Sequence, residues 1–268
     1  MATGEFHKMH GLGNDFVIID ARAHPMDMPP ARARQIADRK QGIGCDQLIL
    51  LLSSDIADVA MRIFNPDGNE VEACGNASRC VIALLKQDLE IETKGGIISG
   101  QLSGADVTVV MGDPKFDWQD IPLAFAMDTR SIPVGWLELE NPMAVNMGNP
   151  HVVFFVENVN NVDLAQIGPN IEHDAIFPKR VNVNVASVEG NEIHLSVWER
   201  GAGLTGACGT GACATAVAGI RQGKVNSPVT VHQSGGSLSI SWAPGEPVIM
   251  TGSATYVFTG QADWDDFG

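Results

Sequence analysis

Two short stretches of the sequence place a cysteine at the start of a predicted helix. The stretch "VEACGNASRC" covers residues 71–80 and contains Cys74, and "TGACGTGACA" covers residues 205–214 and contains Cys208. In both, glycine and small residues follow the cysteine and lead into an alanine-rich segment that favours a helix. The first N–H groups of a helix lack partners within it, and the helix dipole makes that end positive. Each turn is therefore suited to bind a carboxylate and to lower the pKa of its thiol.

A pair of such turns suggests proton transfer at a carbon atom. Gly75 and Gly209 carry no Cβ, so a ligand can approach the backbone closely at both positions. A carboxylate held between the two helix ends would have one sulfur on either side of its α-carbon. We expect Cys74 and Cys208 to remove a proton from one face of that carbon and to return one to the other.

Predicted strands and helices surround both cysteines, so the fold is expected to mix α and β structure. A stretch with two prolines, residues 115–133, is irregular and predicts a linker or a crossing between domains. The predicted strands cover residues 16–20, 47–52, 59–65, 144–156, 192–200, 238–242, 247–252 and 255–260, with a hairpin over 95–114. The predicted helices cover residues 31–40, 77–87 and 208–223.

The two halves of the sequence resemble each other when the cysteine turns are aligned. The alignment pairs Asn65 with Glu199 and Cys74 with Cys208, and a shift by one residue pairs Asn14 with Asn149 and Gln47 with Asn182. Segments that match in the same order indicate two equivalent halves, which would bring both loops to one interface. We expect one domain of residues 1–116 plus 253–268 and a second domain of residues 117–252.

Composition limits the possible partners. The 268 residues carry a net charge of −15, which argues against a nucleic-acid partner because phosphate binding needs clustered Lys and Arg. No apolar run is long enough to cross a bilayer, so no membrane partner is expected. Five cysteines, an odd number, suit a reducing compartment, and their spacing fits neither a redox pair nor a zinc site. We expect a cytoplasmic protein without a metal, in which Cys45, Cys80 and Cys213 are buried structural thiols.

Six motifs in one order resemble the diaminopimelate epimerase family over nearly the whole chain. They are "KMHGLGNDFVIID", "GIGCDQL", "RIFNPDGNEVEACGNASRC", "MGNPHVVFF", "FPKRVNVNV" and "WERGAGLTGACGTGACA". The resemblance implies two similar α/β domains, each a β-barrel-like sheet around a central helix. It also implies an isomerase without a cofactor that interconverts L,L- and meso-2,6-diaminopimelate, on the route to lysine and the bacterial cell wall.

The resemblance assigns roles to residues of this sequence. Cys74 and Cys208 match the two catalytic cysteines, and His151 and Glu199 match the pair that adjusts the proton affinity of the thiols. Backbone amides of Gly75, Asn76, Gly209 and Thr210 match the groups that hold the carboxylate at the reacting end. The side chains that match substrate-binding positions are Asn14, Gln47, Asn65, Asn149, Asn182, Glu199 and Arg200.

Two other functions remain as alternatives. A related two-thiol racemase would act on proline or hydroxyproline, but Cys-Gly-His is expected at its first turn, where this chain has Cys74-Gly75-Asn76. A binding protein without activity would be expected to lose one thiol, and this chain has both. The favoured hypothesis is a homodimeric diaminopimelate epimerase whose only other partner is its small-molecule substrate.

Overall fold

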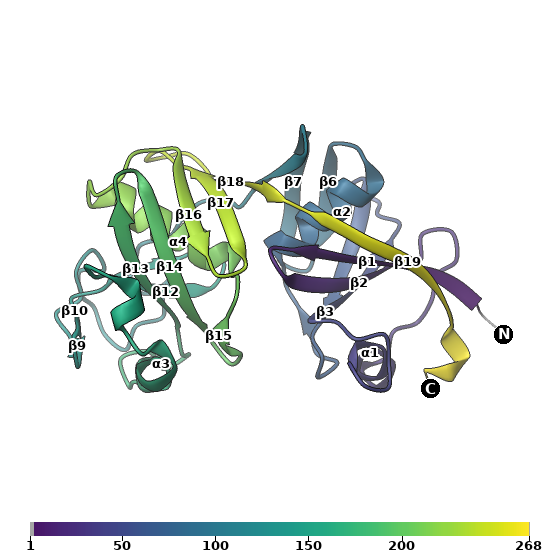
Figure 1. The fold of residues 1–268 in the computed structure, drawn as a ribbon, viewed down its shortest axis with the longest axis horizontal. Helices are drawn as coiled ribbons and strands as arrows, with labels where there is room; N and C mark the ends of the chain where they lie inside the picture. The colour runs from purple at the N-terminus through teal and green to yellow at the C-terminus, as the bar shows by residue number, and fades with distance from the viewer. Residues whose placement is uncertain (1–2, 268) are drawn as a thin grey trace. The chain divides into compact units, whose positions relative to one another are not determined.

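The computed structural model describes residues 3–267, and these residues form two compact units. One unit consists of Met1–Val109 together with Gly252–Gly268, and the other of Val110–Thr251. Each unit mixes strands and helices, which confirms the predicted α/β class (Figure 1). None of the helices formed by residues 3–267 is long and apolar enough to cross a membrane.

The first unit contains the elements from β1 to β8 and then the last strand and the last 3-10 helix of the chain. Strand β19 returns to pair antiparallel with β1, which also pairs with β2 (Figure 1). The elements are β1 (Thr3–Gly11), β2 (Asn14–Asp20), α1 (Pro30–Ala37), β3 (Gln47–Leu52), β4 (Val59–Phe64), β5 (Glu70–Val71), α2 (Gly75–Leu85), β6 (Leu89–Thr93), β7 (Gly96–Ser103), β8 (Asp106–Val110), β19 (Thr255–Asp263) and the 3-10 helix η2 (Trp264–Asp266).

The second unit follows the same plan and adds a short hairpin of two strands. Its elements are β9 (Gly135–Trp136), β10 (Leu139–Glu140), β11 (Met143–Asn146), β12 (Pro150–Phe155), the 3-10 helix η1 (Val159–Asn161), α3 (Leu164–Glu172), β13 (Asn182–Glu189), β14 (Glu192–Glu199), β15 (Gly203–Thr205), α4 (Gly209–Arg221), β16 (Val229–Gln233), β17 (Gly236–Ser241) and β18 (Ile249–Ser253).

The strand pairs repeat from one unit to the other. In the first unit β1–β2 is antiparallel, β2–β3 parallel, β3–β4 and β4–β5 antiparallel, and β4–β6 parallel. In the second unit β11–β12 is antiparallel, β12–β13 parallel, β13–β14 and β14–β15 antiparallel, and β14–β16 parallel. Helix α2 follows β5, and α4 follows β15 at the equivalent place.

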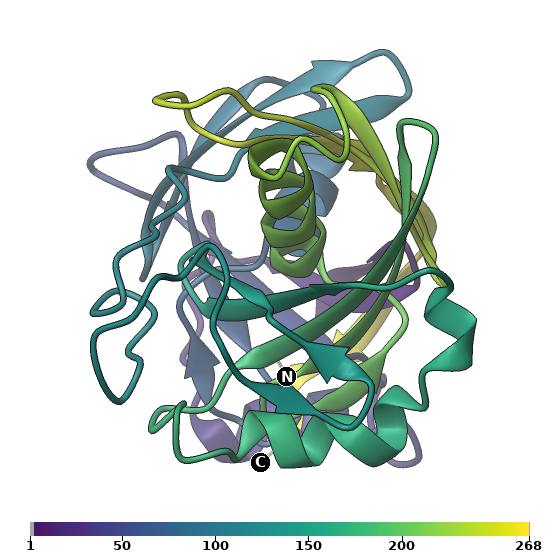
Figure 2. The ribbon, with the colours of Figure 1, turned by 90° about the vertical axis from the view of Figure 1, so that its left-hand side faces the viewer.

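The helix that begins after each cysteine is buried inside its unit. Helix α4 packs against β11, β12, β13, β14, β16 and β17, which curve around it (Figure 2). A helix enclosed on all sides needs small, apolar residues, and "GTGACATAVAGIR" supplies them. Helix α2 likewise contacts β1, β2, β7 and β19, and its first eight residues are buried. Because both helices are fixed by packing, the position of their first turns is fixed as well.

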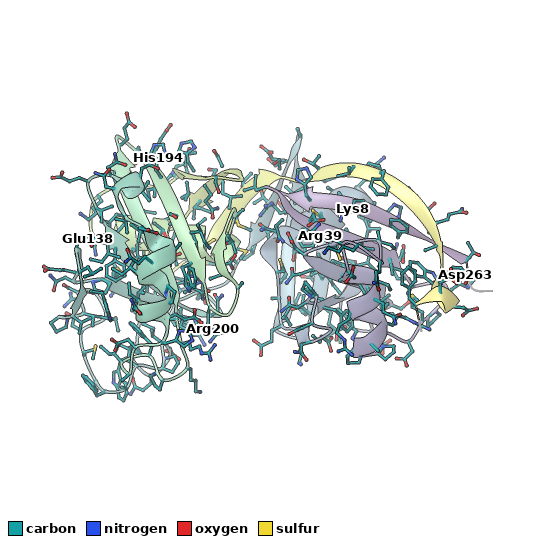
Figure 3. The ribbon with its side chains drawn as sticks, turned by 60° about the horizontal axis from the view of Figure 1, so that its bottom comes forward. Lys8, Arg39, Glu138, His194, Arg200 and Asp263 are labelled. Carbon is teal, nitrogen blue, oxygen red and sulfur yellow. The ribbon has the colours of Figure 1, made fainter. Side chains whose placement is uncertain are left out.

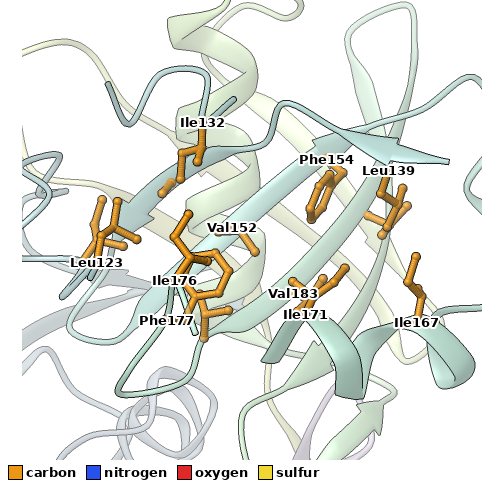
Figure 4. Close-up of a cluster of buried hydrophobic side chains, with 14 of the residues drawn as sticks. Leu123, Ile132, Leu139, Val152, Phe154, Ile167, Ile171, Ile176, Phe177 and Val183 are labelled. Carbon is orange, nitrogen blue, oxygen red and sulfur yellow. The ribbon is translucent and has the colours of Figure 1, made fainter. Parts of the chain in front are cut away.

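Helix α3 was absent from the sequence-based prediction. It is short and contains Pro169, both of which weaken the helical pattern. Its start is marked by Asp163, whose side chain accepts a hydrogen bond from the Gln166 N–H. Ile167 and Ile171 pack into a buried cluster on the sheet face away from α4 (Figure 4). The predicted helices after Pro29 and after both cysteines are confirmed.

Candidate active site

Both predicted cysteines are the N-cap residues of buried helices. Cys74 precedes α2 with backbone angles φ −149° and ψ 110°, and Cys208 precedes α4 with φ −129° and ψ 113°. An N-cap residue in this extended conformation faces the free N–H groups of the first turn. The Cys208 sulfur accepts one of these bonds, from the Gly211 N–H at 3.4 Å. The geometry therefore gives each thiol the positive end of a helix dipole.

In the first unit, three polar side chains meet at one edge of the sheet. Asn14 and Gln47 begin the parallel strands β2 and β3, and Asn65 directly follows the antiparallel β4. Because β4 runs antiparallel to β2 and β3, its last residue lies at the same end of the sheet as their first residues. The Gln47 amide donates to Asn65 Oδ1 at 3.0 Å. The carbonyl Oε1 of Gln47 is buried and has no hydrogen-bond partner among the described residues.

Cys74 belongs to this group through Asn14. The Cys74 thiol lies 4.0 Å from Asn14 Oδ1, and the Asn76 amide donates to the same oxygen at 3.2 Å. Asn76 is held in turn by the fully buried Arg79, whose Nη2 donates to Asn76 Oδ1 at 2.9 Å. The Asn14 amide donates to Asp46 Oδ2 at 3.2 Å, so both ends of its side chain are fixed.

In the second unit, the predicted residues meet at the equivalent sheet edge. Asn182 begins β13, and its amide donates to the Pro150 carbonyl at 2.8 Å while its Oδ1 accepts from the Arg200 N–H at 2.9 Å. Arg200 directly follows β14 and its side chain is exposed (Figure 3). Glu199 ends β14 and accepts a hydrogen bond from Thr205 Oγ1 at 2.6 Å.

A buried carboxylate supports the segment that carries Glu199 and Arg200. Glu172, at the end of α3, accepts from the Trp198 indole N–H at 2.7 Å and from the Gly201 N–H at 3.0 Å. The first bond holds the Trp198 side chain and the second holds the Gly201 backbone, so the residues on both sides of Glu199 and Arg200 are anchored to one carboxylate. Sequence reasoning missed Glu172 because the helix that carries it was not predicted.

The environment of Cys208 favours its protonated form. Burial raises the pKa of this thiol well above its usual range, and the negative charge of Glu199 and a hydrogen bond to it raise the pKa further. Bonds from Thr210 and the Gly211 N–H act in the opposite direction. Glu199 is thus the carboxylate that contacts this thiol.

The three remaining cysteines are buried away from solvent. Cys45, Cys80 and Cys213 are almost fully buried, which confirms their expected burial. Burial raises the pKa of Cys45 and of Cys80 to about 12, so neither forms a thiolate near neutral pH. No group of three or more His, Cys, Asp or Glu side chains among residues 3–267 is arranged to hold a metal ion.

His151 is fully buried in β12 between two asparagines. Its Nε2 lies 2.8 Å from Asn149 Oδ1, and its Nδ1 lies 3.1 Å from the amide nitrogen of Asn184. Burial lowers the pKa of His151 to about 3, and the nearby charge of Arg200 also lowers it. The ring is therefore neutral at physiological pH. Asn184 was not predicted as a site residue, although "NVNV" places two polar residues on one face of a buried strand.

The predicted residues fall into two groups, one in each unit. The first unit brings together Asn14, Gln47, Asn65, Cys74, Gly75 and Asn76, and the second brings together Asn149, His151, Asn182, Glu199, Arg200, Cys208, Gly209 and Thr210.

Comparison with known proteins identifies the family. The profile of diaminopimelate epimerase matches residues 6–116 and 143–257. A diaminopimelate epimerase from Rhizorhabdus wittichii is 62% identical over 265 residues, covering 98% of this chain and 97% of that protein.

Solved structures of low sequence identity share the fold. A phenazine biosynthesis protein of the PhzF family from Bacillus anthracis superimposes with a TM-score of 0.71 at 19% identity, covering 98% of this chain and 99% of the other. A probable proline racemase from Agrobacterium radiobacter superimposes with a TM-score of 0.68 at 16% identity, covering 97% and 92%. The profile match and the high identity over the full length decide the family: the chain belongs to the diaminopimelate epimerases.

Proposed function

We propose that this chain interconverts L,L- and meso-2,6-diaminopimelate without a cofactor, in the supply of lysine and peptidoglycan precursors. The observation that carries the proposal is the matched position of Cys74 and Cys208, each the N-cap of a buried helix in its own unit. Membership of the diaminopimelate epimerase family supports the choice of substrate. The two compact units are, in this proposal, the two epimerase domains.

The reacting carboxylate is bound by backbone N–H groups at the two helix starts. Gly75 and Asn76 supply these groups in the first unit, and Gly209 and Thr210 supply them in the second. The helix dipoles and the exclusion of water stabilise the negative charge that develops on the substrate when its α-proton leaves. This stabilisation replaces the electron sink that pyridoxal provides in other racemases.

Proton transfer uses one thiolate and one thiol. In one direction Glu199 accepts the proton of Cys208, and the thiolate then takes the α-proton, so that the C–H bond breaks as an S–H bond forms. The Cys74 thiol gives its proton to the opposite face, so that its S–H bond breaks as the new C–H bond forms. In the reverse direction the two cysteines exchange roles.

The distal end of the substrate carries an amino group and a second carboxylate, and polar side chains bind it. Arg200 pairs with the carboxylate because its planar guanidinium suits two parallel hydrogen bonds. Asn65, Asn149, Asn182 and Glu199 complete this end, and Asn14 and Gln47 complete the substrate pocket. A ligand without the second carboxylate leaves Arg200 unpaired and binds weakly.

A homodimer is the proposed assembly, with β19 as its contact. This strand pairs with β1, and three consecutive side chains, Tyr256, Val257 and Phe258, are about half exposed. Consecutive residues of a strand point to opposite faces, so β19 exposes apolar side chains on both faces. Exposed apolar side chains gathered on one strand are suited to contact with a second chain. We propose a second copy of this chain as its occupant, and sedimentation of a Tyr256→Lys variant as monomer would support this.

The cytoplasm is the proposed location, because two reactive thiols stay reduced only in a reducing compartment.

The substrate assay separates the proposal from its nearest alternative. Purified protein is incubated with L,L-diaminopimelate, D,D-diaminopimelate or L-proline, and the stereoisomers are separated on a chiral column. Rapid formation of the meso isomer from the L,L form, with slow D,D turnover and stable proline, is the expected result. Turnover of proline without turnover of L,L-diaminopimelate would instead establish the racemase alternative.

A further inference from the structure

Three side chains, two of them fully buried, form a hydrogen-bonded chain beneath the first turn of α4. Asn184 on β13 contacts His151 on β12, and His151 contacts Asn149, which precedes β12. His151 and Asn184 are fully buried. A Cβ added to Gly211 would lie 2.7 Å from Asn184 Oδ1 and 3.3 Å from the Cys208 sulfur. Asn184 therefore lies directly against the helix turn that begins with Cys208.

The orientation of the Asn184 amide is fixed by the backbone. Its Nδ2 lies 2.9 Å from the Val152 carbonyl oxygen, which can only accept a hydrogen bond. The NH₂ group must therefore face β12, and the Asn184 Oδ1 faces Gly211 instead. The second N–H of the same amide then points to His151 Nδ1 at 3.1 Å, which is closer than the Asn182 carbonyl oxygen at 3.5 Å.

This orientation determines which ring nitrogen of His151 carries the proton. Because Asn184 donates to Nδ1, Nδ1 must be the unprotonated acceptor. The single ring proton is then on Nε2, which donates to Asn149 Oδ1 at 2.8 Å. With its oxygen held in this way, Asn149 turns its NH₂ group away from His151.

We propose that Asn184 is a positioning residue that sets the tautomer of His151 and thereby orients the Asn149 amide for a substrate carboxylate. The first part concerns the protein alone, and the second rests on the proposed function. An amide N–H favours a carboxylate, whereas an amide oxygen in the same place repels it.

In the first unit, different residues hold the side-chain oxygen of the equivalent asparagine. Asn14 aligns with Asn149, and its Oδ1 accepts from the Asn76 amide at 3.2 Å. Asn76 is oriented by Arg79, which can only donate. In both units, then, a buried donor holds the asparagine oxygen, and a second buried residue fixes that donor. The neutrality of His151, whose pKa is about 3, agrees with a hydrogen-bonding role rather than a charged one.

The tautomer is measured by NMR on protein labelled with ¹⁵N-histidine. Long-range ¹H–¹⁵N correlations distinguish the protonated from the unprotonated ring nitrogen, and His151 is assigned by its loss in His151→Gln. The expected result for the unaltered protein is a proton on Nε2 only. A proton on Nδ1 would overturn the proposal without any variant.

Two substitutions of Asn184 test whether this residue sets the His151 tautomer. In Asn184→Asp the carboxylate only accepts, so the proton should move to His151 Nδ1. In Asn184→Leu, which has a similar shape and no donor, the single tautomer should give way to a mixture. Asn160→Asp, an exposed change of the same charge in the same unit, should leave the ring unaltered. An Nε2–H tautomer retained in both Asn184 variants would overturn the proposal.

Kinetics test the consequence for substrate. If Asn149 loses its orientation, KM for L,L-diaminopimelate should rise by about 10- to 100-fold, the effect of one lost bond to a charged group, with a smaller change in kcat. An unchanged KM in a variant whose tautomer has moved would overturn the link to substrate. Inactivity of the unaltered protein would refute the proposed function, while the NMR result would still decide the role of Asn184.

Discussion

His151 should make the second unit sensitive to acid, and the expected size of the effect follows from its burial. The pKa of this ring falls from 6.5 to about 3 because burial disfavours the charged form. Below pH 6.5 the unfolded chain binds a proton at this position that the folded chain does not bind. Stability is therefore lost as the pH falls through 6.5, and the loss continues down to about pH 3.

The magnitude comes from the difference between the two pKa values. At pH 5 the unfolded form is favoured by about 2 kcal/mol relative to pH 8, since each pH unit below 6.5 contributes about 1.4 kcal/mol. Carboxylates titrate in the same range, so the unaltered protein alone cannot isolate this contribution. In His151→Gln the titrating ring is gone, and the other groups remain. The difference in unfolding free energy between the two proteins should therefore change by about 2 kcal/mol from pH 8 to pH 5.

Tryptophan fluorescence can report on the second unit alone. Four of the five tryptophans lie in Val110–Thr251, and only Trp264 lies in the other unit. In a Trp264→Phe background, urea unfolding is followed at several pH values for the protein with and without His151→Gln. His194→Gln, at a partly exposed histidine of the same unit, is the matched control. A free-energy difference that stays constant from pH 8 to pH 5 would show that His151 is protonated in the folded protein.

Three further predictions concern the thiols and the absence of a cofactor. Either Cys74→Ala or Cys208→Ala should reduce epimerisation by at least about 10²–10⁴-fold, because each removes a proton-transfer partner. The controls Cys80→Ala and Cys213→Ala should retain most activity. Initial rates measure the activity and circular dichroism checks the fold, and an equal loss of activity in Cys80→Ala would contradict the prediction. Glu199→Gln removes a charge that raises the pKa of Cys208, so alkylation of Cys208, followed by peptide mass spectrometry, should shift to lower pH; an unchanged pH profile would contradict the contact. Activity should survive dialysis against a chelator, with no absorbance from bound pyridoxal, and loss of activity that added zinc restores would count against a metal-free mechanism.

The sequence was informative where local pattern and chemistry coincide. Most predicted strands and the helices after Cys74 and Cys208 follow from short-range periodicity and are found in the structure. The single strand predicted over residues 144–156 is wrong, because the chain turns at residues 147–149 and forms the antiparallel pair β11 and β12. The site residues were assigned by their positions in the family motifs. Because the same pattern occurs twice, the equivalence of Asn14 with Asn149 could be inferred before any contact was known.

The supporting residues could not be predicted, because their roles depend on contacts between distant segments. Glu172, at the end of α3, accepts hydrogen bonds from Trp198 on β14 and from Gly201 just after β14. A single glutamate in the sequence gives no sign of these contacts. The neutral state of His151 depends on its burial, and its hydrogen-bond partner Asn184 is 33 residues away. The alternation of "NVNV" was the one available signal, since polar residues on a buried strand face need partners.

The central claim is that one thiol acts on each face of the α-carbon, and deuterium labelling tests it most directly. L,L-Diaminopimelate is incubated with the protein in deuterated water, and product and remaining substrate are analysed at low conversion. With two separate bases, the meso product should carry one deuterium at one α-carbon, and the remaining substrate should carry none. Deuterium in the remaining substrate at early times, or retention of the original proton in the product, would show that a single base acts on both faces and would contradict the account.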